Sequence, residues 1–220
     1  MTRLRFEFRA IGILLFALFS FSAANAAPGP ATITYRRVFK GSTPEFTEIK
    51  VTEQGKCTFD LRQLDEDADA EPFEVGAPVR QKIFELAGDL KNFAIPSLDI
   101  QKKIANLGEK TFRYEHDSEV HETTFNYTLD ATANQLMQIF EGLARQQGDL
   151  VQLQRRIKYD RLGVNDALLQ FESDMDHRLL PEPERLLPVL DQIDQDSRFM
   201  QISRTKARAL AERIRNSHDH

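Results

Sequence analysis

The sequence predicts an α+β protein, in which a small antiparallel sheet of about five strands with one packed helix is followed by an all-helical C-terminal region. In the first half of the chain, apolar and polar residues alternate in short runs, as half-buried strands require. From Asp130 onward, apolar residues recur every three or four positions, as amphipathic helices require. The change of period near residue 128 separates the two parts.

Five alternating runs predict the strands. In chain order they are a segment from Ile33 to Phe39, then 46–52, 56–62, 111–116 and 120–127. Arg37 interrupts the apolar row of the first run. A short turn carrying Gly55 joins the second and third runs into a hairpin, and 117–119 makes the turn of another. Antiparallel strands with one apolar face are the expected product.

One helix is predicted between the third and fourth strands. Pro78 suits its first turn, where a missing N–H has no partner to lose. Its apolar stripe consists of Val79, Ile83, Leu86, Ala87 and Leu90. Because the stripe covers one side only, we expect this helix to lie on the apolar face of the sheet.

The C-terminal region predicts several packed antiparallel helices. A long stripe extends from Leu136 to Ile157, and Gly142 and Gly148 indicate a bend or break in it. Further helices are expected after Gly163, after Pro183 and after Asp196 or Ser197. The predicted organisation is 1–26 signal peptide, 27–31 disordered lead-in, 32–128 α+β domain, 129–215 helical region and 216–220 disordered tail.

The N-terminus predicts export by a bacterial-type signal. A basic start precedes an apolar run of about a dozen residues, and Ala24 and Ala26 supply the small side chains that a signal peptidase reads. Cleavage is expected between Ala26 and Ala27. The apolar run is shorter than the roughly 20 residues of a spanning helix. We therefore expect a soluble periplasmic or secreted protein with no membrane span after cleavage.

The charge of the mature chain argues against two classes of partner. Without the signal, 26 basic and 33 acidic residues remain, a net charge of −7. A nucleic-acid groove needs a cationic footprint, so no nucleic-acid partner is predicted. Electrostatic docking to anionic lipid is disfavoured for the same reason.

Few residues point to chemistry. Asp65, Asp67 and Asp69 alternate as in a calcium loop, but Ala70 and Gly76 stand where that loop needs Gly and Glu, so a solvated acidic loop is expected.

His116 and His121 flank the turn of the second hairpin, yet zinc needs three or four converging ligands, so a polar hairpin tip is expected. Cys57, the lone cysteine, alternates with Phe59 and Leu61 and is expected to be a small buried residue. Ser203 and Lys206 match an acyl-transfer pattern whose companion elements are missing.

No catalytic signature, metal site or cofactor is predicted from these patterns. The leading expectation is a non-enzymatic exported protein that binds a protein partner, or associates with itself, through apolar surface left over on the helical region. One alternative is a small-molecule enzyme of the hydrolase type, with a site assembled from distant residues. A second alternative is a calcium-binding structural protein.

Overall fold

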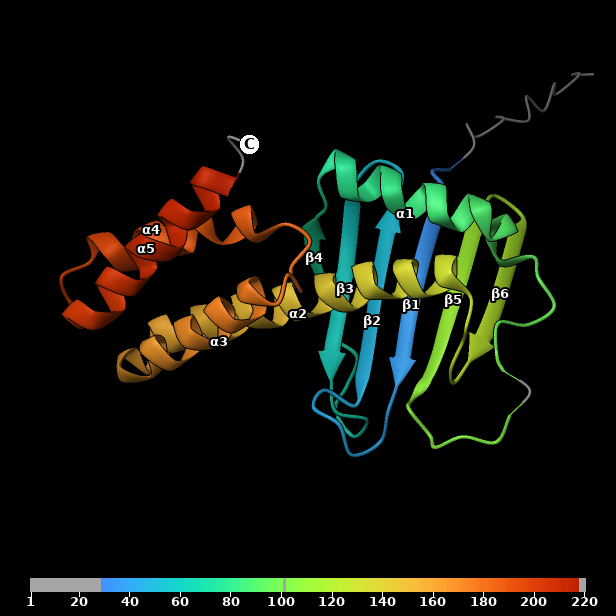
Figure 1. Ribbon diagram of the computed structural model, residues 1–220, viewed down its shortest axis with the longest axis horizontal. Coiled ribbons are helices and arrows are strands. Elements are labelled where there is room, and N and C mark those ends of the chain that lie inside the picture. Colours follow the sequence, from blue (N-terminus) through green and yellow to red (C-terminus); the bar gives the residue numbers. More distant parts are fainter. Residues whose placement is uncertain (1–28, 101, 218–220) are drawn as a thin grey trace, which may run out of the picture.

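The computed structural model describes residues 29–100 and 102–217, and within them it confirms the α+β class (Figure 1). One antiparallel sheet has the strand order β4-β3-β2-β1-β5-β6. Its strands are β1 (Thr32–Val38), β2 (Phe46–Thr52), β3 (Lys56–Arg62), β4 (Glu71–Glu74), β5 (Glu109–His116) and β6 (Glu119–Phe125). The predicted signal and its cleavage residues Ala24, Ala26 and Ala27 lie outside the described residues. Among those described, no helix has the length and apolar character needed to cross a bilayer.

The sheet has six strands where about five were expected, and the additional one is β4. The acidic loop was expected to lead straight into the first helix, but Glu71–Glu74 pair with Lys56–Phe59 at the sheet edge. Phe73 is the only large apolar side chain of β4, and it packs edge-on against Phe59, 5.8 Å between ring centroids. Because a single large apolar residue produces no alternating apolar and polar pattern, this strand could not be predicted from the sequence. Pro72 is tolerated because an edge strand can lack one N–H.

The helices α1 (Ala77–Asp89) and α2 (Ala131–Tyr159) lie across one face of the sheet (Figure 1). Asp130 caps α2 by accepting a hydrogen bond from the Ala133 N–H at 2.8 Å. With 29 residues, α2 is about 44 Å long, whereas six strands make a sheet only about 24 Å wide. The second half of α2 therefore extends beyond the β4 edge. α2 continues through Gly142 and Gly148, so the break that was one of the two expectations for these residues does not occur.

The projecting half of α2 packs with η2 (Arg161–Gly163) and α3 (Val164–Asp176). The helical region is completed by η3 (Pro183–Leu186), α4 (Leu187–Gln195) and α5 (Gln201–Ser217), and α5 packs on both α3 and α4. The short η1 (Lys91–Phe93) follows α1 and contacts β5 and β6. The last helix begins at Gln201 and not near Asp196, because the Asp196 carboxylate accepts from the Arg198 N–H at 3.0 Å and turns the chain before the helix. Consecutive helices run in opposite directions (Figure 1).

Two hydrophobic cores result, and α2 contributes to both. Leu136, Phe140 and Leu143 join the core under the sheet, where Phe140 stacks on Tyr35 at 5.4 Å. Leu153 joins the core of the helical region. Ion pairs fasten α5 to its neighbours: Lys206 to Glu172 of α3 at 2.6 Å, and Arg208 to Asp194 of α4 at 2.8 Å.

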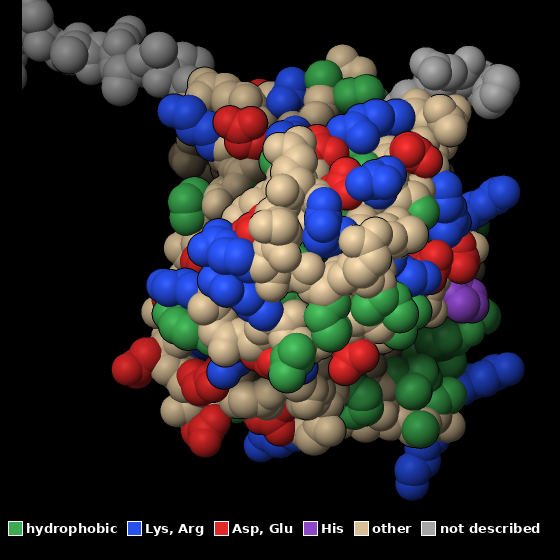
Figure 2. All heavy atoms as spheres, turned by 90° about the vertical axis from the view of Figure 1, so that its left-hand side faces the viewer, with side chains coloured by type: hydrophobic (Ala, Val, Ile, Leu, Met, Phe, Trp, Pro, Cys, Tyr) green, Lys and Arg blue, Asp and Glu red, His purple; other side chains and the backbone are tan. Residues whose placement is uncertain are grey.

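The free end of the helical region carries both charged and exposed apolar side chains, the latter including Tyr159 and Leu162. Figure 2 shows that charged side chains of both signs cover this end, with hydrophobic ones scattered among them. Of the residues in the predicted helical stripes, Ile202 is the one that is mainly exposed, at 59%. The predicted stripes are thus almost completely buried, and the other exposed apolar residues of this end, Tyr159, Leu162 and Met200, lie outside them.

Candidate functional site

Two adjoining hollows lie where α2 leaves the sheet. The first, which we call the junction pocket, has a volume of about 290 Å³ and is lined by β1, β2, β3, α2, α3 and the β1–β2 loop. Its charged residues are Arg37, Glu141, Arg145, Asp149 and Asp174. The second, the loop groove, has a volume of about 550 Å³ and lies between the end of β3, the acidic loop and α2. Thr43, Pro44, Leu61 and Gly148 line both, so the two hollows share a wall.

In the junction pocket, a first cluster of polar side chains connects β1 to α2. The Arg37 guanidinium lies 3.4 Å from one oxygen of Glu141, and the Tyr35 hydroxyl donates to the other. Burial, reinforced by the negative charge of Glu141, raises the pKa of Tyr35 far above its ordinary value, so the phenol remains a hydrogen-bond donor. Arg37 points to the helix side of the sheet, which is why it interrupts the apolar row in the sequence.

A second group joins α2 to α3. Asp174 is buried and accepts from Arg145 at 3.3 Å and from Gln170 at 3.0 Å. Asp149 lies beside it. Burial and, next to it, the negative charge of Asp174 together raise the pKa of Asp149 to about 7. The Oδ2 atom of Asp149 has no hydrogen-bond partner among the described residues.

This arrangement can hold one proton between two carboxyl groups near neutral pH. A carboxyl group that titrates near pH 7 can donate or accept a proton under physiological conditions. The same site offers two guanidinium groups and several carboxylate oxygens to a polar ligand. Binding and acid–base chemistry are both compatible with this set of groups.

The loop groove contains part of the predicted acidic motif. Asp67 and Asp69 line it together with Glu66 and Glu71, whereas Asp65 is exposed outside it. The opposite wall consists of α2 residues, among them Val151 and Arg155.

The two predicted histidines occupy one face of the second hairpin. Tyr114 pairs with His121 across the strands, and His116 lies two positions along β5 on the same side. His116 lies 3.8 Å from Asp117, and His121 lies 3.6 Å from Glu119. Among residues 29–100 and 102–217, no three or more His, Cys, Asp or Glu side chains are grouped as metal ligands.

Cys57 is buried, as predicted, and its thiol contacts the Gly55 carbonyl oxygen at 3.4 Å. Burial raises the pKa of this thiol to about 11, so it is protonated at neutral pH. Ser203, the first residue of the acyl-transfer pattern, is also buried. The Lys206 ammonium donates a hydrogen bond to Glu172 at 2.6 Å, so its partner is a residue other than Ser203.

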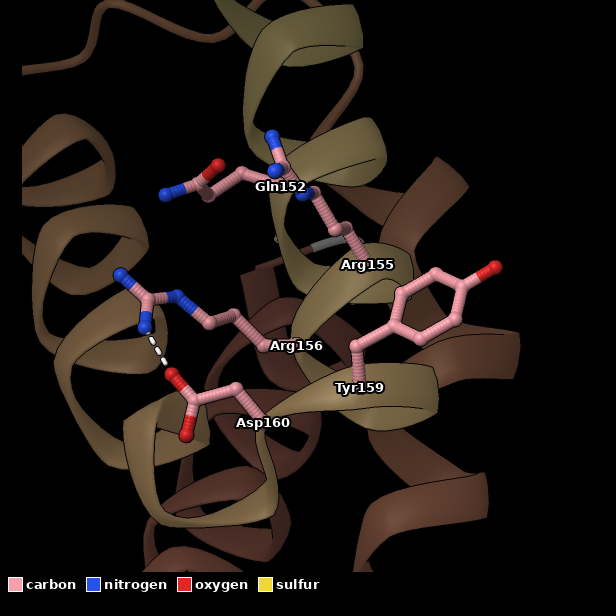
Figure 3. Close-up of a pocket in the computed structure, with 5 residues that line it drawn as sticks. All are labelled: Gln152, Arg155, Arg156, Tyr159 and Asp160. Atoms are coloured by element: carbon pink, nitrogen blue, oxygen red, sulfur yellow. Dashed lines mark hydrogen bonds and ion pairs between the residues drawn. The ribbon is translucent and has the colours of Figure 1, made fainter.

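A third hollow, of about 350 Å³, lies along the last turns of α2 (Figure 3). Its lining residues are Gln152, Arg155, Arg156, Tyr159 and Asp160. Figure 3 shows Arg156 paired with Asp160 and Tyr159 turned away from them. Because all five come from one helix end, no groups converge on it from a second element, and it is a weaker candidate.

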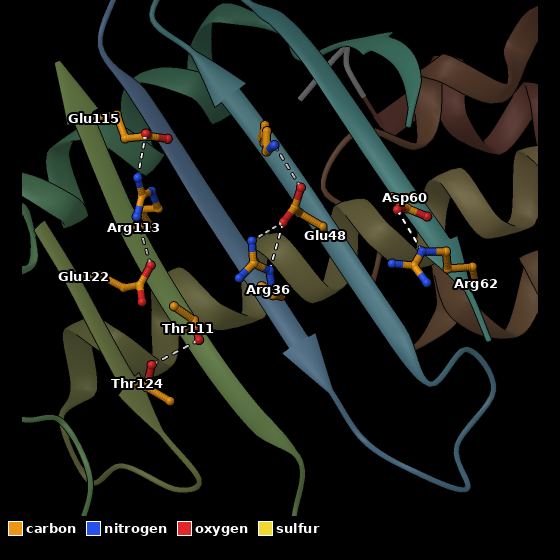
Figure 4. Close-up of polar contacts among 10 residues, drawn as sticks. Arg36, Glu48, Asp60, Arg62, Thr111, Arg113, Glu115, Glu122 and Thr124 are labelled. Carbon is orange, nitrogen blue, oxygen red and sulfur yellow. Dashed lines mark hydrogen bonds and ion pairs between the residues drawn. The ribbon is translucent and has the colours of Figure 1, made fainter. Parts of the chain in front are cut away.

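The face of the sheet opposite the helices is polar (Figure 4). Arg36 donates two hydrogen bonds to Glu48, at 2.7 and 2.9 Å, and Arg113 contacts Glu115 at 2.9 Å and Glu122 at 3.3 Å. The Arg36–Glu48 and Arg113–Glu122 pairs each join neighbouring strands, and such cross-strand pairs suit a face in contact with water.

No protein-family model matches this chain, and no curated protein matches it. Sequence reasoning did not single out Glu141, Arg145, Asp149 or Asp174, because each looks like an ordinary polar residue of an amphipathic helix. Of the charged residues in the junction pocket, only Arg37 could be recognised in the sequence as unusual, because it is a charged residue in the apolar row of a predicted strand.

Proposed function

We propose that this chain is an exported, non-enzymatic binding protein whose partner occupies the junction pocket and the loop groove. The observation that supports the proposal is that these two hollows adjoin, so that charged groups from the sheet, α2 and α3 lie close together on one part of the surface. A site of this kind offers a partner both salt bridges and apolar contact, since Pro44, Leu61 and Val151 also line it.

The test is an affinity isolation from the envelope fraction of bacteria that express the full chain with a C-terminal tag. We would compare the wild type with Asp67→Lys/Asp69→Lys, which reverses two exposed charges in the groove. Glu85→Lys, an exposed charge reversal on α1, is the matched control. A partner retained by the wild type and the control, and lost by the groove variant, supports the proposal. A set of bound proteins that is identical for all three contradicts it.

Export is part of the same proposal, and it rests on the N-terminal pattern of the sequence. The expected result is that protein recovered from the envelope fraction begins at Ala27, as measured by mass spectrometry. Recovery of uncleaved chain from the cytoplasm would contradict it.

A second candidate function is acid–base catalysis on a small molecule. It is favoured by the pKa of Asp149, raised to about 7 by burial and by Asp174. A panel of chromogenic esters, phosphate esters and glycosides would be screened with the wild type and with Asp149→Asn. Hydrolysis that the wild type catalyses and the variant loses would favour the enzyme over the binding protein.

Self-association through the helical region stays a prediction. The exposed apolar residues available at its free end are Tyr159, Leu162, Met200 and Ile202. Light scattering at high concentration is the measurement, with Ile202→Lys as the variant. A dimer that dissociates in the variant would support self-association, and a wild-type monomer would contradict it.

A further inference from the structure

The free end of the helical region is formed by two turns that lie side by side. One is the end of α2 with η2, and the other joins α4 to α5. The Arg161 guanidinium carbon lies 6.0 Å from the centre of the Phe199 ring, which connects the two turns. Both lie at the end of the helical region that is farthest from the sheet (Figure 1). We call the surface formed by residues 158–162 and 198–204 the tip.

Large apolar side chains of the tip are open to water. Tyr159 and Leu162 are 72% and 74% exposed, and Met200 and Ile202 of the other turn are exposed as well. None of the four belongs to the core of the helical region. Large apolar side chains that gather on one exposed surface mark a contact with something outside the chain.

Three cations of the tip are not held by a carboxylate. Among residues 29–100 and 102–217, Lys158, Arg161 and Arg204 take part in no ion pair. The Lys158 ammonium lies 4.9 Å from the centre of the Tyr159 ring, and the Arg204 Nε donates to the backbone carbonyl oxygen of Asp194 at 2.8 Å. The positive charge of these side chains is therefore available to a partner.

The carboxylates of the tip are already engaged. Asp160 pairs with Arg156, and Asp196 pairs with Arg198 at 2.6 Å. Asp166, in the first turn of α3, is exposed and offsets one of the three cations. The tip keeps a positive excess, so the net negative charge of the chain, which disfavours anionic lipid as a partner, does not describe this end.

A bilayer with anionic headgroups offers this surface both kinds of contact that it needs. Headgroup phosphates attract Lys and Arg, and the acyl boundary beneath them accepts apolar side chains. A tyrosine suits the boundary itself, because its ring is apolar and its hydroxyl is polar. A second copy of the tip would bring like charges together, and a nucleic acid would leave Leu162 and Ile202 without apolar contact.

From these observations we infer that the tip docks on the surface of an anionic phospholipid bilayer, with its four exposed apolar side chains inserted at the headgroup boundary. No residue of the tip lines the junction pocket or the loop groove, so the inference does not rest on the proposed function.

The probes are two kinds of sucrose-loaded vesicle, one of phosphatidylcholine alone and one in which about a third of the lipid is phosphatidylglycerol. Protein purified from cells that express the full chain would be sedimented with each at physiological salt. We expect it to sediment with the anionic vesicles and to stay in solution with the neutral ones. Raising the salt concentration should weaken the binding, because salt screens the charges.

The charge of the tip is tested by Lys158→Glu/Arg161→Glu, which should bind the anionic vesicles about tenfold more weakly. Its control, Lys102→Glu/Lys103→Glu, makes the same change of charge in the exposed loop before β5 and should bind as the wild type does. Insertion is tested by Leu162→Ser, which should weaken binding about threefold. Its control, Leu129→Ser, removes a leucine that is also 74% exposed but lies at the other end of α2. Circular dichroism checks that each variant is folded.

Several results would overturn the inference. These are no sedimentation with anionic vesicles, equal sedimentation with both kinds of vesicle, and equal losses in the tip variants and their controls. Full binding by Leu162→Ser would also overturn it, because the tip would then attract anions without entering a bilayer. A groove-dependent partner in the affinity isolation would support the proposed function in each of these cases, so the two can fail separately.

Discussion

The backbone N–H of Gly76 donates a hydrogen bond to the carboxylate of Glu182 at 2.6 Å, across 106 positions of the chain. Gly76 directly precedes α1, the helix that lies on the sheet, and Glu182 follows α3 in the helical region. The Glu182 N–H also donates to the Gln146 side chain of α2 at 3.0 Å. One residue thus fastens the returning chain to both helices that cover the sheet, and its side chain is only 4% exposed.

Removing this carboxylate should destabilise the protein. A hydrogen bond to a charged group contributes about 1.5–3 kcal/mol, and truncation also leaves the Gly76 N–H without its acceptor. We expect Glu182→Ala to lower the free energy of unfolding by about this amount, as measured by urea denaturation. Glu182→Gln keeps an acceptor and should lose less.

The control is Glu212→Ala on the exposed side of α5, which should change the free energy of unfolding by no more than about 0.5 kcal/mol. If both alanine variants lose the same amount, Glu182 does not have the anchoring role inferred from its contacts.

The sequence predicted elements whose cause is local. The α1 helix is one such case, since Pro78 at its start and the stripe through Ile83 and Leu86 are features of a single segment. Strand β4 was not predicted from the sequence, because its residues lack an alternating pattern and their conformation is decided by pairing with β3.

The candidate site was less predictable, because its groups meet only through packing. Arg145 and Asp174 are 29 positions apart and belong to different helices, and no local pattern indicates that they touch. Arg37 could be noticed because it occupies an inward position of a strand. Asp67 and Asp69 were noticed for a calcium-like spacing, whereas the structure places them along a groove wall.

The role of Gly142 also depends on packing, and this gives a second prediction. A Cβ atom at this position would lie 2.7 Å from the Leu179 carbonyl oxygen and 2.9 Å from the Pro181 ring. Alanine is the better helix former by about 1 kcal/mol, but overpacking costs about 1–3 kcal/mol. We therefore expect Gly142→Ala to lower the melting temperature measured by calorimetry.

The matched substitution is Gly88→Ala near the end of α1, where a new Cβ would meet nothing within 4 Å. Helix propensity alone should then act, and the melting temperature should rise slightly. A rise in both variants would mean that the segment at Leu179 and Pro181 moves aside without cost.

Cys57 provides a third prediction. Burial raises its pKa to about 11 and shields it, and the thiolate is the reactive form. The native protein should react very slowly with Ellman's reagent at pH 8, and at once in 6 M guanidinium chloride. Rapid native labelling, or a covalent dimer on a non-reducing gel, would contradict the buried position.

The acidic loop provides a fourth prediction. Asp65, Asp67 and Asp69 are all exposed along the loop, and a calcium ion needs six to eight oxygen ligands around it. The melting temperature should therefore be the same with millimolar calcium and with a chelator. A calcium-dependent rise would favour the calcium-binding structural protein that the spacing suggests.

The carboxyl pair of the junction pocket should make stability depend on pH in a particular direction. The pKa of Asp149 in the folded protein is about 7, above its ordinary value of 3.8, so the folded state holds this proton more tightly than the unfolded chain does. The contribution of Asp149 to stability is therefore greatest in acid, falls as the pH rises from about 4 to about 7, and remains unfavourable above that.

Asp149→Asn removes the titration and the repulsion from Asp174. We expect the variant to melt a few degrees above the wild type at pH 8, and this difference to shrink steadily as the pH is lowered to 4, where the carboxyl becomes protonated in the unfolded wild type as well as in the folded protein. Asp89→Asn, an exposed substitution on α1, should give an offset that does not change between these pH values. A constant difference for Asp149→Asn would show that the carboxyl does not titrate in this range, and the acid–base candidate would then lose the observation that favours it.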